Sequence, residues 1–188
     1  MAYPQTTKQC MTSDEFLAWS SDDGLRYELI DGQTIVMQTP IDRHQTVMGN
    51  IWLACRQHLK DTACTAYMAL DVRVDDANCL VPDVFVTCGR EDKATPRGKT
   101  HVPLVVEVLS PSTAAFDRNG KFARYRRLPA LCEYMLVDVE RLSTEVHRRC
   151  PDGAWEVLRH SAADIVELMS IDLQLRGDLI FADLERAA

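Results

Sequence analysis

The sequence predicts an α/β fold with a mixed central β-sheet flanked by helices, and three observations support this prediction. Two runs of apolar and β-branched residues, 79–87 and 102–109, are typical of buried strands. Apolar residues recur at helical spacing between residues 42 and 59. Along the chain the segments follow the order helix, hairpin, helix, strands, helix, strands, which favours a sheet with helices on its faces.

The composition favours a single soluble domain over residues 1–188. An apolar content of 46% and a charged content of 26% exclude a disordered chain. No apolar run approaches the roughly 20 residues of a membrane span, and the first eleven residues lack the apolar core of a signal peptide. We therefore expect a cytoplasmic protein without a membrane partner.

The charge and the cysteines exclude further classes of protein. A net charge of -7 argues against a protein that coats nucleic acid with its whole surface, although a basic patch can still lie beside an acidic, metal-binding centre. The seven cysteines form no C-x-x-C pair, so we interpret them as reduced thiols rather than a disulfide framework or a zinc site. The histidines show no metal-ligand spacing.

The N-terminal third contains a helix, a hairpin and a second helix. Thr12 and Glu15 fit a capping box, which predicts a short helix ending at Gly24. An Asp-Gly pair between the strand-like runs 25–30 and 33–37 predicts a hairpin. A long amphipathic helix should run from residue 42 or 44 to about residue 59, with His44 capping or solvating its start.

The remainder alternates between strands and helices. We expect strands at 66–74, 79–87 and 102–109, with a polar loop at 88–100 and Asp71 on the exposed side of the first strand. A basic helix at 117–128 should stop at Pro129. Strands at 133–139, 143–148 and 155–160 should follow, then a weakly strand-like tail at 164–175 and a short helix at 180–185.

Two acids, Asp83 and Glu107, stand inside apolar runs, where a carboxylate is costly unless a cation or hydrogen bonds compensate it. Mg²⁺ prefers oxygen ligands, so the two carboxylates and the carbonyl of Val108 form a candidate metal site. Lys121 is the candidate to orient an attacking water and to neutralise charge in phosphodiester cleavage. Tyr125, one helical turn later, shares the face of Lys121 and can support it or contact phosphate.

Each of these residues also has a purely structural interpretation. Asp83 can be a turn acid, Lys121 a solvated charge on a basic helix, and Tyr125 part of the core. Arg118 and Arg124 can bind DNA phosphates or form a solvated helix face. The serines near residue 110 lack a G-x-S-x-G motif and do not indicate a nucleophile.

The pattern Pro82-Asp83 … Glu107-Val108-Leu109 resembles the signature of PD-(D/E)XK nucleases, except that Leu109 stands in place of the signature lysine. The wider sequence resembles the Uma-two family of restriction-endonuclease-like bacterial proteins. The similar pieces are Tyr27-Glu28-Leu29-Ile30-Asp31-Gly32, His44, Asp71-Val72-Arg73, Pro82-Asp83, the heptad Glu107-Val108-Leu109-Ser110-Pro111-Ser112-Thr113, Asp117, Lys121, Tyr125 and Glu133-Tyr134 … Leu136-Val137-Asp138. The chain departs from the family pattern at Met135 and at Leu128-Pro129.

The resemblance implies a restriction-endonuclease-like fold and a DNA endonuclease that uses Mg²⁺, with Mn²⁺ as a substitute. It implies metal binding by Asp83 and Glu107, a catalytic lysine moved to Lys121, and Glu28 as an additional acid near the metal. It also implies a homodimer. Two other hypotheses stay open: a catalytically silent protein that binds nucleic acid or metal, and a homo-oligomeric interaction protein on the same fold. Glu28 can alternatively pair with Arg26 or Arg73.

Overall fold

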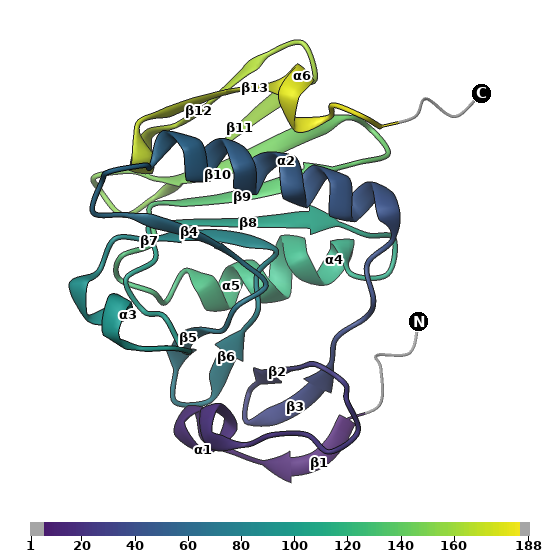
Figure 1. The fold of residues 1–188 in the computed structure, drawn as a ribbon, viewed down its shortest axis with the longest axis vertical. Coiled ribbons are helices and arrows are strands. Elements are labelled where there is room, and N and C mark those ends of the chain that lie inside the picture. The colour runs from purple at the N-terminus through teal and green to yellow at the C-terminus, as the bar shows by residue number, and fades with distance from the viewer. Residues whose placement is uncertain (1–5, 185–188) are drawn as a thin grey trace.

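A six-stranded mixed β-sheet forms the centre of the computed structural model, which describes residues 6–184 (Figure 1). The strand order is β11-β10-β9-β8-β7-β4. The β8–β9 pair is parallel and the other pairs of this sheet are antiparallel. The strands are β4 (Thr65–Met68), β7 (Val84–Thr87), β8 (Leu104–Leu109), β9 (Glu133–Asp138), β10 (Ser143–Arg149) and β11 (Trp155–Ser161). The predicted mixed central sheet is therefore confirmed.

A second sheet and the first helix form an N-terminal lobe, at the bottom of Figure 1. Its strand order is β1-β3-β2-β6-β5. The strands are β1 (Thr6–Cys10), β2 (Tyr27–Ile30), β3 (Gln33–Val36), β5 (Val72–Asp75) and β6 (Asn78–Leu80). The β2–β3 hairpin turns at Asp31 and Gly32, both with positive φ, as an Asp-Gly turn requires. The predicted capping box opens α1 (Ser13–Ala18), which ends at Ala18 with Trp19 as its C-cap, rather than at Gly24.

Helices cover both faces of the central sheet. Along β8, Val106 and Val108 pack in the same apolar cluster as Val47 of α2 (Asp42–His58), while Val105 packs with Tyr125 on the opposite face. This division follows from the alternation of side chains along a strand. The opposite face is covered by a continuous helical segment made of α4 (Ala114–Phe116), the π-helical η1 (Asp117–Lys121) and α5 (Phe122–Tyr125). The predicted loop 88–100 contains a short helix, α3 (Arg90–Ala94).

Two of the predicted strands are wrong in the same way. The segments 66–74 and 79–87 each divide into two strands that belong to different sheets. Ala69 interrupts the first segment with a left-handed backbone, and Pro82 interrupts the second because it lacks an N–H to donate. The chain thus leaves the N-terminal lobe after Leu80 and joins the central sheet at Val84, which places Asp83 at the entrance of β7.

The C-terminal segment adds a two-stranded sheet of β12 (Ile165–Leu168) and β13 (Leu173–Arg176) around a 3₁₀ turn, η2 (Met169–Ile171). The last helix among the described residues is α6 (Gly177–Ile180), which ends at the residue where the predicted helix 180–185 should begin. Residue 185 lies outside the described part of the chain. Within residues 6–184, no helix has both the length and the apolarity to cross a membrane.

A disulfide joins Cys64 and Cys88, whose Cα atoms lie 4.0 Å apart. Cys64 directly precedes Thr65 of β4 and Cys88 directly follows Thr87 of β7. Because Thr65 and Thr87 are paired in an antiparallel ladder, the register brings the two cysteines together. The interpretation of all cysteines as reduced thiols is therefore wrong for this pair. The other cysteines are free.

Candidate active site

Asp83 and Glu107 meet across the β7–β8 pair. Val84 lies opposite Val106 in this antiparallel ladder, Asp83 directly precedes Val84, and Glu107 directly follows Val106, so the two acids lie side by side where β7 begins. Asp83 also accepts a hydrogen bond from the N–H of Val108, at 2.7 Å, which fixes its carboxylate beside the strand that carries Glu107.

His44 belongs to this site, contrary to the expectation that it only caps or solvates the start of α2. Its Nε2 atom lies 3.2 Å from Oδ2 of Asp83. Burial lowers the pKa of His44, but the hydrogen bond to Asp83 and a hydrogen bond to the backbone of Val108 outweigh this effect and raise the pKa. The Nδ1 atom is buried without a hydrogen-bond partner. The sequence placed His44 at the start of the helix, but spacing alone did not connect it with Asp83.

Lys121 approaches Glu107 from the face of the central sheet that lies opposite to α2, the helix that carries His44. Its Nζ atom lies 3.0 Å from Oε1 of Glu28 and 3.1 Å from Oε1 of Glu107. The lysine ends η1, and π-helical turns are rare and frequent at functional sites. Leu109, at the position of the signature lysine, is buried in the apolar cluster of Tyr125. The structure therefore brings Lys121 to the acids, as its proposed role requires.

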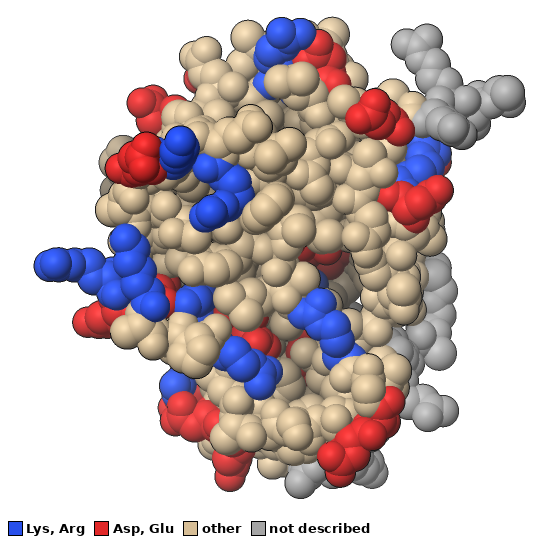
Figure 2. Space-filling view, in the orientation of Figure 1, with Lys and Arg blue, Asp and Glu red and all other residues tan. Residues whose placement is uncertain are grey.

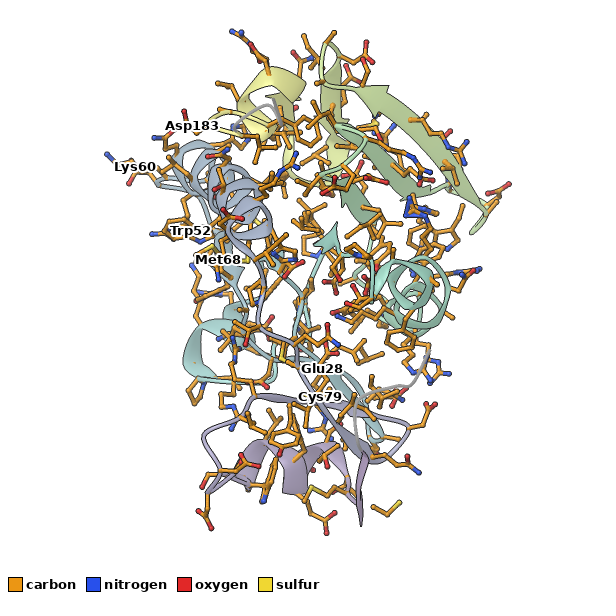
Figure 3. All side chains as sticks on the ribbon, turned by 90° about the vertical axis from the view of Figure 1, so that its right-hand side faces the viewer. Glu28, Trp52, Lys60, Met68, Cys79 and Asp183 are labelled. Carbon is orange, nitrogen blue, oxygen red and sulfur yellow. A yellow bond between two sulfur atoms is a disulfide. The ribbon has the colours of Figure 1, made fainter. Side chains whose placement is uncertain are left out.

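Glu28 comes from β2 and lies where the N-terminal lobe meets the rest of the molecule (Figure 3). Besides its ion pair with Lys121, it accepts a hydrogen bond from the N–H of Val81, at 2.9 Å. Arg26 instead donates to the carbonyl of Ala69, and Arg73 pairs with acids of the N-terminal lobe. Among the described residues, the contacts of Glu28 thus join it to the candidate site rather than to either arginine.

Asp117 is a fourth acid that was not among the predicted site residues. It is buried, and its Oδ1 atom lies 3.9 Å from Nζ of Lys121. The signal in the sequence was its position four residues before Lys121, since residues at that spacing share one side of a helix.

Burial controls the electrostatics of these groups. Burial is the main reason that the pKa of Glu107 lies well above its usual range. The charge of Lys121 lowers this pKa, whereas the neighbouring acids raise it further. Burial also raises the pKa of Asp117, again against the effect of Lys121. For Lys121, burial lowers the pKa, but the surrounding carboxylates, first Glu107, raise it well above its usual range. The lysine is therefore a permanent cation among carboxylates that outnumber it.

The residues expected to bind substrate have other contacts. Tyr125 is fully buried, and its hydroxyl donates to Oε1 of Glu107 at 3.3 Å, so it holds the acid and is not exposed to a phosphate. Arg118 pairs with Glu145 at 3.0 Å. Arg124 pairs with Asp31 at the tip of the β2–β3 hairpin. The contact of Arg124 connects the basic helical segment to the hairpin that carries Glu28, so it positions the site.

The oxygen atoms of Asp83, Glu107 and Val108 can be compared with the ligands that divalent cations prefer. Within residues 6–184, no group of three or more His, Cys, Asp or Glu side chains forms a complete metal-binding cluster. Mg²⁺ does not need one, because it is usually held by one or two carboxylates, waters and substrate phosphates. Asp83 and Glu107 supply two carboxylates beside Val108, in a site where buried acids outnumber cations. Mg²⁺ therefore fits these residues better than a structural Zn²⁺, whose site is usually closed by four cysteine and histidine ligands.

Taken together, the mixed sheet and the acids gathered around one lysine define a nuclease-like α/β protein. Residues 13–179 match the model of the Uma2 family, described as "Putative restriction endonuclease". The chain belongs to this family, which is the family that its sequence resembles.

Relatives and a solved structure agree with this assignment. The chain is 33% identical over 177 residues to "Uncharacterized protein slr1290" of Synechocystis sp., covering 93% of each protein. It is 28% identical over 155 residues to "Uncharacterized protein sll1609" of the same organism, covering 79% of this chain and 86% of that protein. A crystal structure of "a putative nuclease belonging to DUF820 from Anabaena variabilis" superposes with a TM-score of 0.74 at 20% identity, covering 92% and 98% of the two chains. This last likeness establishes the shared fold.

Asp71 and Arg97 form an ion pair outside the candidate site. Asp71 is buried, so its expected place on an exposed strand face is wrong. Its two carboxylate oxygens accept hydrogen bonds from Arg97 at 2.7 and 3.2 Å. The alternation of residues along a strand did not reveal this pairing, because Asp71 lies between β4 and β5 and Arg97 lies after α3.

Proposed function

We propose that this protein is a metal-dependent DNA endonuclease that hydrolyses phosphodiester bonds, with Mg²⁺ as its metal and Mn²⁺ as a substitute. The observation that carries the proposal is the convergence of Glu28 and Glu107 on the Nζ atom of Lys121, at 3.0 and 3.1 Å. Asp83 lies beside Glu107, since it accepts a hydrogen bond from the N–H of the next residue, Val108, so the metal and the lysine would act on the same phosphate. The family description supports the same class of reaction.

Each residue has a distinct task in this proposal. Asp83 and Glu107, with the carbonyl of Val108, would hold the cation, which supplies Lewis acidity toward a phosphate oxygen. Lys121 carries three N–H donors. Two of them bind Glu28 and Glu107, and the third can orient an attacking water or stabilise the charge that develops on phosphate. Glu28 and Tyr125 keep Lys121 and Glu107 in place.

Plasmid DNA cleavage with Mg²⁺ or Mn²⁺ tests the proposal. The wild type should nick or linearise plasmid, whereas Asp83→Ala, Glu107→Ala and Lys121→Met should each lose at least about a hundredfold in rate, as for other groups that stabilise charge in a transition state. Glu140→Ala is the matched control, because Glu140 is exposed and lies outside the site. Equal cleavage by the wild type and the site variants would show that these residues do not carry the activity.

The competing function is a catalytically silent protein that binds nucleic acid or metal, as a homo-oligomer, on the same fold. It is favoured by one observation: the ammonium of Lys121 is paired with Glu28 and with Glu107, the acid that would otherwise bind the metal. If no variant and no wild-type sample cuts DNA, but Mn²⁺ binding measured by calorimetry disappears in Asp83→Ala, this second function replaces the first. Light scattering of the same samples measures whether the proposed homodimer exists.

A further inference from the structure

A cavity of about 310 Å³ lies beside the candidate active site and has no part in the proposed chemistry. Its walls come from the end of α1, the entrance of β2, the β4–β5 connection and the loop after α3. Figure 2 shows acidic and basic side chains close together where the N-terminal lobe meets the rest of the molecule. Of the residues that line the cavity, Asp71 is the acid, and Arg26 and Arg97 are the bases. Ligand pockets usually measure about 300–1,000 Å³, so this cavity suits one small ring system.

Backbone hydrogen bonds join the cavity to two of the site acids. Val81, a wall residue, donates its N–H to Glu28. Ala69, another wall residue, donates its N–H to the carbonyls of Pro82 and Asp83, both at 3.1 Å. Ala69 has a φ of 47°, a left-handed conformation that non-glycine residues adopt at a cost and that clusters at functional sites. A group in the cavity would therefore lie next to a phosphate held by the acids.

One side of the cavity is aromatic. Phe16, Trp19 and Tyr27 line it, and their rings pack against one another, with centroids 6.2 Å apart for Phe16 and Trp19 and 5.1 Å apart for Trp19 and Tyr27. The hydroxyl of Tyr27 donates to Asp23, so this ring is fixed. Leu25 stands at the mouth with 51% of its surface exposed. Rigid aromatic and aliphatic surfaces of this kind bind flat apolar faces.

Two guanidinium groups complete the walls. Arg97 is held by its paired hydrogen bonds to Asp71 and donates to the carbonyl of Leu17 at 3.1 Å. Arg26 donates to the carbonyl of Ala69. Because both planes are anchored by the protein, they can stack on a π-system without a large loss of side-chain entropy. Arginine planes and aromatic rings together are the surfaces on which proteins stack unpaired bases.

We infer that this cavity binds one unpaired nucleobase of the substrate, next to the bond that is cut. The inference rests on the proposed function, because it takes the neighbouring acids to hold a DNA phosphate. A base inside a duplex is stacked and paired, and its extrusion costs a few kcal/mol. The protein therefore prefers DNA with a single-stranded segment at the cleavage point over intact duplex.

Binding measured without metal tests the inference apart from cleavage. In EDTA, a short single-stranded oligonucleotide with one 2-aminopurine should bind the wild type with quenching of the 2-aminopurine fluorescence, and a blunt duplex of the same sequence should bind at least about tenfold more weakly. One base stack accounts for a factor of this size, since tenfold equals about 1.4 kcal/mol.

Two variants and a matched control locate the binding. Leu25→Glu should weaken single-strand binding about tenfold by placing a negative charge at the mouth, and Arg26→Ala should reduce the quenching. Leu53→Glu is the control, since Leu53 lies on α2 with 49% of its surface exposed and does not line the cavity. The inference is overturned if the duplex binds as tightly as the single strand, or if Leu25→Glu behaves like Leu53→Glu.

The plasmid assay keeps the two proposals separate. If plasmid is not cut but the quenching and its loss in Leu25→Glu hold, the base pocket stands and the nuclease function fails. If plasmid is cut and the two leucine variants bind single strands equally, the nuclease function stands and the base pocket fails.

Discussion

Removal of the Lys121 charge is the perturbation with the most direct physical consequence. In Lys121→Met the side chain keeps a similar length, but Glu28 and Glu107 lose the ammonium that lies 3.0 and 3.1 Å from them. Both carboxylates are buried. Breaking a buried ion pair by removing one partner costs about 3–5 kcal/mol. For a chain of 188 residues this lowers Tm by about 6–20 °C.

The pH dependence gives an independent estimate of the same quantity. Burial raises the pKa of Glu107, and Lys121 is the influence that lowers it, so the pKa rises further in the variant. A raised carboxyl pKa favours the folded state at low pH, and this contribution is lost as pH rises toward the folded-state pKa. The variant should therefore match the wild type most closely near pH 5. One proton contributes at most about 1.36 kcal/mol per pH unit, or about 4 kcal/mol between pH 5 and 8. This is an upper bound on the difference from the wild type, because the pKa of Glu107 is raised in the wild type as well.

Urea unfolding at pH 5 and pH 8 measures both effects, with Lys93→Met as the control because Lys93 is exposed. In the double variant Glu107→Gln with Lys121→Met, part of the lost stability should return, since one uncompensated charge is gone. A difference below about 1 kcal/mol at pH 8, without dependence on pH, would refute the idea that Lys121 neutralises this cluster.

Three further predictions concern neighbouring contacts. His44→Ala should weaken Mn²⁺ binding at least about tenfold in calorimetry, because His44 orients Asp83, and His44→Gln should recover part of the loss by restoring a donor; equal losses would exclude the hydrogen bond as the cause. Asp71→Asn should lower the free energy of unfolding by about 1–2 kcal/mol, a moderate value because the Arg97 side chain is partly exposed; an unchanged urea midpoint would contradict this. Reduction of the disulfide between Cys64 and Cys88, or its removal with serine at both positions, should lower the free energy of unfolding by about 3 kcal/mol for a separation of 24 residues. A urea midpoint that does not change when reductant is added would show that the thiols are not joined in solution.

Local signals in the sequence were sufficient for several elements. The Thr12 capping box, the Asp-Gly hairpin and the long helix over 42–58 depend on neighbouring residues, and the structure confirms all three. The buried acid Glu107 was also visible, because a carboxylate in the middle of a fully apolar strand requires a partner from elsewhere. These features are determined by residues close together along the chain.

Contacts between distant segments were decided only by the tertiary structure. The residue pattern predicted single strands at 66–74 and 79–87. An apolar run has the same pattern whether its residues all belong to one sheet or divide between two sheets. The pairing of His44 with Asp83 and of Arg124 with Asp31 joins residues far apart in sequence, where spacing carries no information. The sequence by itself thus indicated that the carboxylates of Asp83 and Glu107 need compensation by a cation or by hydrogen bonds, and that Lys121 is a candidate partner. Only the fold decided between the alternative partners of Glu28 and brought His44 and Asp117 to the same place, because strand register and helix placement set which buried charges meet.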